Sequence, residues 1–317
     1  MSVLQSIILG IIQGLTEFFP VSSSGHLVII PYFLNWDYVP LYYTITVHFA
    51  TLAALLTVFY REIYRIIRSL ILAVFIKSQR KENNFKLGIF ILIASIPSAA
   101  IGFLLERYIQ DLFTRPILVA FFLVVTAAVL WLGELRGKNV EMRIKERNSK
   151  EYWYKNSKNN NRKNGDNKKD YNIIGDVSLT GSCNGRVNFN LFISLIVGIG
   201  QALAILPGIS RSGATISFAR FFGIKRSESV KFSFLLSMPV IFGSFVFELF
   251  KSYTIIFNND FLILRNLIIG FAFSYISGLF AIRFLIRYTR NKNLNVFAVY
   301  CIGIAIAIFV FYFFKKF

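Results

Sequence analysis

Six stretches of this sequence are apolar over about 20 residues, the length that an α-helix needs to cross a bilayer. Hydrophobic residues make up 55% of the 317-residue chain, which agrees with a membrane protein rather than a soluble one. We therefore predict an all-α, polytopic integral membrane protein. Its six transmembrane helices are expected near residues 42–60, 87–105, 117–134, 230–250, 262–282 and 296–314.

Two further apolar stretches, 1–34 and 191–223, are each broken near the middle by proline and a turn rich in serine and glycine. A broken helix of this kind can enter the membrane and return to the same side, provided that lipid does not reach its backbone. We predict a re-entrant helical hairpin in each stretch.

The two hairpins share a sequence pattern that indicates an internal duplication. In both, a glutamine precedes a Ser-Gly pair by eleven residues, and a glycine and a serine also fall in register. The matching residues are Gly10, Gln13, Ser22, Ser24 and Gly25 in the first copy, and Gly198, Gln201, Ser210, Ser212 and Gly213 in the second. We predict two repeats, 1–134 and 191–317, each with one hairpin and three spans.

The positive charges predict how the repeats are oriented. Lys and Arg gather in the connections 61–86, 135–190 and 283–295, and are sparse in 106–116 and 251–261. Basic connections stay in the cytoplasm, so the first hairpin should enter from outside and the second from inside. Such inverted-topology repeats build their binding site where the broken helices meet. Because the net charge of +19 lies mostly in these connections, we expect no nucleic-acid partner.

The connection 135–190 has few large apolar residues over its central part, about 137–186. A segment of this composition cannot bury enough surface to offset its chain entropy. We predict a disordered, polar cytoplasmic linker, either a tolerated insertion or a docking segment.

Glu17 is a carboxylate inside an apolar run, where it should face a cavity and a partner. Gln13 lies four residues earlier, on the same face of a helix. The two could bind Mg²⁺ or Ca²⁺ through oxygen atoms, or Glu17 could accept a proton. Alternatively, Glu17 only neutralises Arg211 as a buried pair.

His26 directly follows Ser22, Ser23, Ser24 and Gly25. A serine beside a histidine that a carboxylate orients is the usual pattern of an activated nucleophile. The histidine could instead attack phosphorus itself or protonate a leaving phosphate. Sequence reasoning leaves these roles open. By contrast, His48 has no ionisable neighbour in sequence, and we expect a packed or pore-facing structural residue.

The stretch 207–215 reads Pro-Gly-Ile-Ser-Arg-Ser-Gly-Ala-Thr and is typical of an oxyanion cradle. Glycines let backbone amides approach an anion, and Arg211 offers a two-pronged fork that suits phosphate. The predicted phosphate-binding residues in this stretch are Gly208, Ser210, Ser212, Gly213 and Thr215, and those from the first hairpin are Ser22, Ser24 and Gly25.

These two motifs resemble the signatures of the undecaprenyl-diphosphate phosphatase family of the bacitracin-resistance type. The first signature is Glu or Gln, three residues, Glu, and then Pro-Val-Ser-Ser-Thr/Ser-Gly-His, which residues 13–26 match. The second is Pro-Gly-x-Ser-Arg-Ser-Gly-x-Thr, which residues 207–215 match. The long insert at 137–186 departs from the family pattern.

The resemblance implies a membrane enzyme that hydrolyses undecaprenyl diphosphate and recycles the lipid carrier of cell-wall synthesis. It implies a divalent cation, a homodimer, and an active site open to the outer face of a bacterial plasma membrane. By position, Glu17, Ser23 and His26 match the family's catalytic residues, and Ser210, Arg211 and Thr215 its phosphate-binding ones. A lipid-carrier translocase or secondary transporter would share this fold and its central anion site, whereas a structural scaffold would need neither charge nor histidine there.

The predicted topology can be tested by cysteine labelling, after Cys183 and Cys301 are replaced. A cysteine at Asn258 should react with a membrane-impermeant thiol reagent in intact cells, because 251–261 is expected outside. A cysteine at Asn160 should not react. Labelling of Asn160, or equal labelling of both, would contradict the inverted arrangement.

Overall fold

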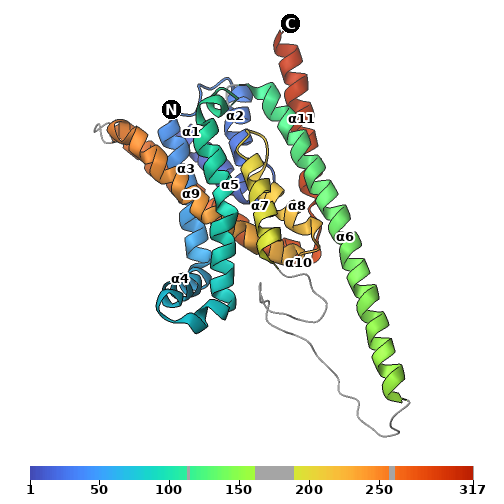
Figure 1. Ribbon diagram of the computed structural model, residues 1–317. Coiled ribbons are helices and arrows are strands. Elements are labelled where there is room, and N and C mark those ends of the chain that lie inside the picture. The colour runs from blue at the N-terminus through green and yellow to red at the C-terminus, as the bar shows by residue number, and fades with distance from the viewer. Residues whose placement is uncertain (113–114, 161–188, 257–260, 317) are drawn as a thin grey trace.

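The computed structural model describes residues 1–112, 115–160, 189–256 and 261–316 (Figure 1). These ranges contain eleven α-helices, one short 3-10 helix at Lys77–Lys81, and no β-strand. The helices are α1 (Val3–Phe18), α2 (Ser23–Leu34), α3 (Leu41–Val58), α4 (Tyr60–Phe75), α5 (Asn83–Leu112), α6 (Pro116–Asn160), α7 (Leu191–Leu203), α8 (Arg211–Phe221), α9 (Arg226–Ile256), α10 (Phe261–Asn291) and α11 (Asn295–Lys316).

Six of these helices are long and apolar enough to cross a membrane: α3, α5, α6, α9, α10 and α11. They coincide with the six predicted spans, and the prediction of an all-helical, multi-pass membrane protein is confirmed. Their outward faces carry large apolar side chains, such as Phe103 on α5 and Ile276 on α10. Lipid covers such surfaces at no cost, because hydrocarbon chains are as apolar as the side chains.

Two connections between the spans contain helical structure, and one of them differs from the sequence prediction. The basic connection 61–86 contains α4, an amphipathic helix that follows α3 directly. Helix α6 continues through the first part of the predicted linker to Asn160 and projects well beyond the other helices (Figure 1). A polar composition reduces burial but does not prevent a helix rich in Glu, Lys and Arg. The remaining predicted linker, 161–188, lies outside the described residues.

Helices α1 and α2 form the first predicted hairpin, and α7 and α8 form the second. Each second helix begins with a serine cap: Ser22 Oγ accepts a hydrogen bond from Gly25 N, and Ser210 Oγ accepts one from Gly213 N. Because a cap satisfies an otherwise unpaired backbone donor, it fixes where the helix starts. Ser22 and Ser210 are the serines that align in the two sequence copies.

The packing of the first helix in each hairpin repeats as well. A Cβ atom on Gly10 of α1 would lie 2.7 Å from Gly270 O of α10. On α7, a Cβ atom on Gly198 would lie 2.3 Å from Ala94 O of α5. Only glycine permits these backbones to approach so closely. The equivalent glycines of the two repeats therefore support equivalent helix contacts.

The two hairpins also start from opposite ends of the molecule. In Figure 1 the N-terminus lies at the same end as the C-terminal end of α11, whereas α7 begins near the end that carries α4. A hydrogen bond of 2.8 Å from Lys315 Nζ to Asn35 Oδ1 joins the end of α11 to the end of α2. How deeply each hairpin enters the membrane stays a prediction.

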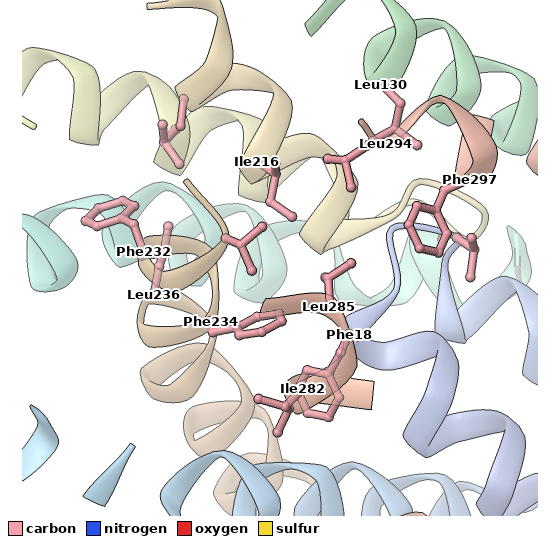
Figure 2. Close-up of a cluster of buried hydrophobic side chains, with 14 of the residues drawn as sticks. Phe18, Leu130, Ile216, Phe232, Phe234, Leu236, Ile282, Leu285, Leu294 and Phe297 are labelled. Atoms are coloured by element: carbon pink, nitrogen blue, oxygen red, sulfur yellow. The ribbon is translucent and has the colours of Figure 1, made fainter. Parts of the chain in front are cut away.

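A hydrophobic core lies where the hairpins meet the spans (Figure 2). Phe18, at the end of α1, packs edge-on against Phe234 of α9, with ring centroids 5.4 Å apart. Ile216 of α8 and Ile282 of α10 are fully buried in the same cluster. This core holds the last turn of α1 and the first turns of α8 in place, directly beside the polar groups described next.

Candidate active site

Glu17 lies in the last turn of α1 and is only 7% exposed. Gln13 Nε2, one turn earlier, donates a hydrogen bond of 2.9 Å to Glu17 Oε2. Ser23 Oγ, at the start of α2, donates to the same oxygen at 2.5 Å. The break between the two helices therefore turns Ser23 back onto the carboxylate, so a hydroxyl and a proton acceptor are already in contact.

Arg211, the first residue of α8, forms an ion pair with Glu17 through Nη2 and Oε1. Its Nη1 also reaches the carbonyl oxygen of Ser237 on α9, at 3.5 Å. The ion pair joins the two hairpins. From the opposite entry of the hairpins we expect Glu17, His26 and Arg211 to converge in one pocket, and the structure brings together only Glu17 and Arg211. The guanidinium side chain is 19% exposed, so one side of it remains accessible.

These groups line a cavity of about 850 Å³. Its polar wall is made by residues of both hairpins: Glu17, Ser22, Ser23, Ser24, Ser210 and Arg211. Apolar and aromatic side chains form a large part of the remaining wall, among them Ile45, Val240 and Phe245. A charged head group and an apolar tail can therefore share this one cavity.

His26 does not line the cavity. Its ring is 3% exposed and both nitrogens are engaged: Nδ1 with Ser22 O at 2.8 Å and Nε2 with Tyr300 Oη at 2.9 Å. The ring also stacks on Tyr300 of α11, with centroids 5.7 Å apart. Here His26 ties α2 to α11, rather than contacting Ser23 or Glu17.

His48 on α3 is the histidine that lines the cavity. Its Nδ1 donates to Thr44 O at 2.7 Å, which leaves Nε2 directed at Glu17 Oε2, 3.6 Å away. Sequence reasoning missed this contact because it looked for a partner nearby in sequence. The sequence did contain an indication of this role, because an ionisable residue within a transmembrane span is costly and usually belongs to a functional site.

The predicted phosphate-binding residues divide into two groups. Ser22, Ser24 and Ser210 line the cavity beside Arg211. The others lie behind that wall and hold its backbone: Thr215 Oγ1 donates to Arg211 O at 2.8 Å, and Ser212 Oγ donates to Phe19 O at 3.1 Å. Gly25 and Gly213 donate to the two serine caps.

Gly208 shapes the turn that presents Arg211. It has a φ of +101°, in the region that favours glycine, and a Cβ atom there would lie 2.5 Å from Val119 O. Thr126 of α6 holds this turn, because its Oγ1 donates to Gly208 O at 2.8 Å and accepts from Ser210 N at 3.0 Å. Sequence analysis did not single out Thr126.

Gln13 and Glu17 fit part of a cation site. The Gln13 amide contacts Glu17 through its Nε2. Its other atom, Oε1, is buried and has no hydrogen-bond partner within the described residues. Mg²⁺ commonly uses one or two protein oxygens and completes its coordination with substrate phosphates and water. No cluster of three His, Cys, Asp or Glu residues that could hold a metal ion occurs in the described part of the chain.

Comparison with known proteins places the chain in a family. The family model of the bacitracin resistance protein BacA matches residues 6–307. A protein of Methanobrevibacter smithii named undecaprenyl-diphosphatase is 34% identical over 318 residues, which cover 98% of both chains. A protein of the same name from Korarchaeum cryptofilum is 33% identical over 313 residues, 97% of this chain and 98% of the relative. The chain therefore belongs to the family of the bacitracin resistance protein BacA.

Proposed function

We propose that this protein is a membrane phosphatase that hydrolyses undecaprenyl diphosphate to undecaprenyl phosphate and inorganic phosphate, and so recycles the cell-wall lipid carrier. The observation that carries the proposal is the contact of Ser23, Glu17 and Arg211 at the polar wall of a largely apolar cavity. The name of the relatives supports the same substrate class.

Ser23 is the nucleophile in this proposal. Its Oγ attacks the terminal phosphorus while its proton passes to Glu17 Oε2, which already accepts its hydrogen bond. The bond between that phosphorus and the bridging oxygen breaks, and its electron pair leaves with the lipid monophosphate. Water then cleaves the phosphoserine, Glu17 returns its proton to Ser23, and the proton of the water leaves with inorganic phosphate. His26 is a poor alternative because both of its nitrogens are engaged elsewhere.

Arg211 changes partner during the reaction. Before substrate arrives it neutralises Glu17. A phosphoryl group can take over its fork, which leaves Glu17 free to accept the proton of Ser23. The guanidinium then faces the charge that develops on the transferring group, where a fixed donor is most effective.

We further propose that Glu17 and Gln13 Oε1 bind a divalent cation together with the diphosphate. When bound, the cation neutralises charge on the phosphate oxygens.

The cavity opens toward the end of the molecule that carries Asn35 and Lys315, both of which line it. The described parts of the basic connections, 61–86, 135–160 and 283–295, lie toward the other end (Figure 1), so we place the opening on the outer face of a bacterial plasma membrane. The homodimer implied by the sequence resemblance stays a prediction.

Substitution of Arg211 tests the site. The purified protein in detergent should release inorganic phosphate from a polyprenyl diphosphate, and Arg211→Lys should lose at least about tenfold in kcat/KM, or about 1.4 kcal/mol. Lysine keeps the charge but cannot reproduce the two-pronged contact. Arg61→Lys on exposed α4 is the matched control. Activity of Arg211→Lys within about threefold of wild type would exclude this role.

The nucleophile is tested by two neighbouring serines that both line the cavity. Ser23→Ala should reduce turnover by about 10³-fold or more, because no other hydroxyl contacts Glu17 in the described structure. Ser24→Ala should retain most of it. If the two variants lose similar activity, Ser23 is not the attacking group.

The proposed cation site is tested by adding a negative charge to its ligands. Gln13→Glu should lower the Mg²⁺ concentration for half-maximal activity by roughly tenfold, since an added carboxylate strengthens binding of a hard cation. The measurement is a Mg²⁺ titration of chelator-treated protein. An unchanged midpoint would place the cation away from Gln13.

A further inference from the structure

Gln201 and Ser98 are buried polar side chains that the mechanism above does not use. Gln201, on α7, is 2% exposed, and neither its Nε2 nor its Oε1 has a hydrogen-bond partner among the described residues. Ser98, on α5, is 4% exposed, and its Oγ likewise has none. Both side chains line the same cavity as Glu17 and Arg211. Buried polar groups without a partner are rare in proteins and call for an explanation.

Helix α5 packs against α7 with Gln201 and Ser98 at a similar level along the two helices. Gly198 of α7 lies directly against Ala94 of α5. Further along both helices, a Cβ atom on Gly102 of α5 would lie 3.8 Å from Ile205 Cδ1, just beyond α7. Gln201 and Ser98 each come about one helical turn after the Gly198–Ala94 contact, so they lie at a similar level along the two helices.

In the first repeat, the residues equivalent to Gln201 and Ser98 have hydrogen-bond partners within the protein. There the equivalent residues are Gln13 on α1 and Ser274 on α10, and both have partners: Gln13 Nε2 donates to Glu17, and Ser274 Oγ donates to Val47 O at 2.9 Å. In the second repeat the position equivalent to Glu17 is Ile205. The second repeat therefore keeps the amide and the hydroxyl but has lost the carboxylate.

Gln201 Nε2 and Ser98 Oγ are two neutral hydrogen-bond donors without a protein acceptor among the described residues, and Gln201 Oε1 is an acceptor without a donor. Leaving such groups unpaired costs free energy, so an apolar pair would stabilise the resting protein better. An oxyanion in the cavity would satisfy both donors. A diphosphate brings two phosphoryl groups, and in the mechanism above Ser23 and Arg211 contact only the reacting one.

We propose that Gln201 and Ser98 bind the phosphoryl group that remains on the lipid, while the reacting phosphoryl group lies at Ser23 and Arg211. The inference rests on the proposed function, because it assigns a place to the second half of the same substrate. The two repeats then divide the work: the first supplies the nucleophile and its base, and the second supplies Arg211 and a donor pair that selects a diphosphate over a monophosphate.

The test compares two ligands on the purified full-length protein in detergent, without turnover. One is a polyprenyl methylenediphosphonate, which cannot be hydrolysed between its phosphorus atoms, and the other is the polyprenyl monophosphate. In Gln201→Met and in Ser98→Ala the Kd of the diphosphonate should rise by about tenfold, equivalent to about 1.4 kcal/mol. The Kd of the monophosphate should change by less than about twofold, or about 0.4 kcal/mol.

Thermal stability without ligand is the second readout. Gln201→Met removes an unpaired amide at nearly constant length, so its Tm should stay the same or rise. Gln79→Met, in the 3-10 helix outside the cavity, is the matched control and should change neither ligand's Kd.

Three outcomes would overturn the proposal: an unchanged Kd for the diphosphonate, equal weakening of both ligands, or weakening that appears only with Mg²⁺ and vanishes with a chelator. The last would indicate a cation at Gln201 instead. A lower Tm with unchanged Kd values would indicate that the pair is structural and binds water. If Gln201 controls diphosphonate binding but no phosphate is ever released, the proposed hydrolysis fails and the subsite stands.

Discussion

The ion pair between Glu17 and Arg211 is the interaction on which the site depends. Each charge alone would be costly inside an apolar membrane protein, and removing one partner of a buried pair leaves the other uncompensated. Because each residue comes from a different hairpin, the site exists only when both hairpins are in place. The two charges neutralise each other, and in the proposed mechanism a phosphate replaces Glu17 as the partner of Arg211.

Much of this arrangement could be predicted from sequence. The six spans follow from hydropathy, because a bilayer requires long apolar helices and little else. The meeting of Glu17 and Arg211 follows from the uneven distribution of Lys and Arg among the connections, which predicts that the two hairpins enter the membrane from opposite sides. The position of Ser23 beside Glu17 follows from the short break between α1 and α2.

The roles of the two histidines could not be predicted, because they depend on which neighbour each helix face meets. His26 lies one turn from Ser22, yet it faces Tyr300 on a helix that is remote in sequence. His48 has no partner near it in sequence, and only the packing of α3 brings it to Glu17. The extent of α6 was also missed, since a lack of apolar residues was taken as a lack of structure. Gln201 was recognised only as a marker of the repeat.

Helix α6 has a consequence for imaging this protein. Its 45 residues span about 68 Å at 1.5 Å per residue, more than twice the roughly 30 Å of a hydrocarbon core. Helix α11, the last span of the second predicted repeat, has only 22 residues and so has no such projecting part. In electron micrographs of detergent particles, this rod would act as a built-in fiducial that distinguishes one end of the small particle from the other.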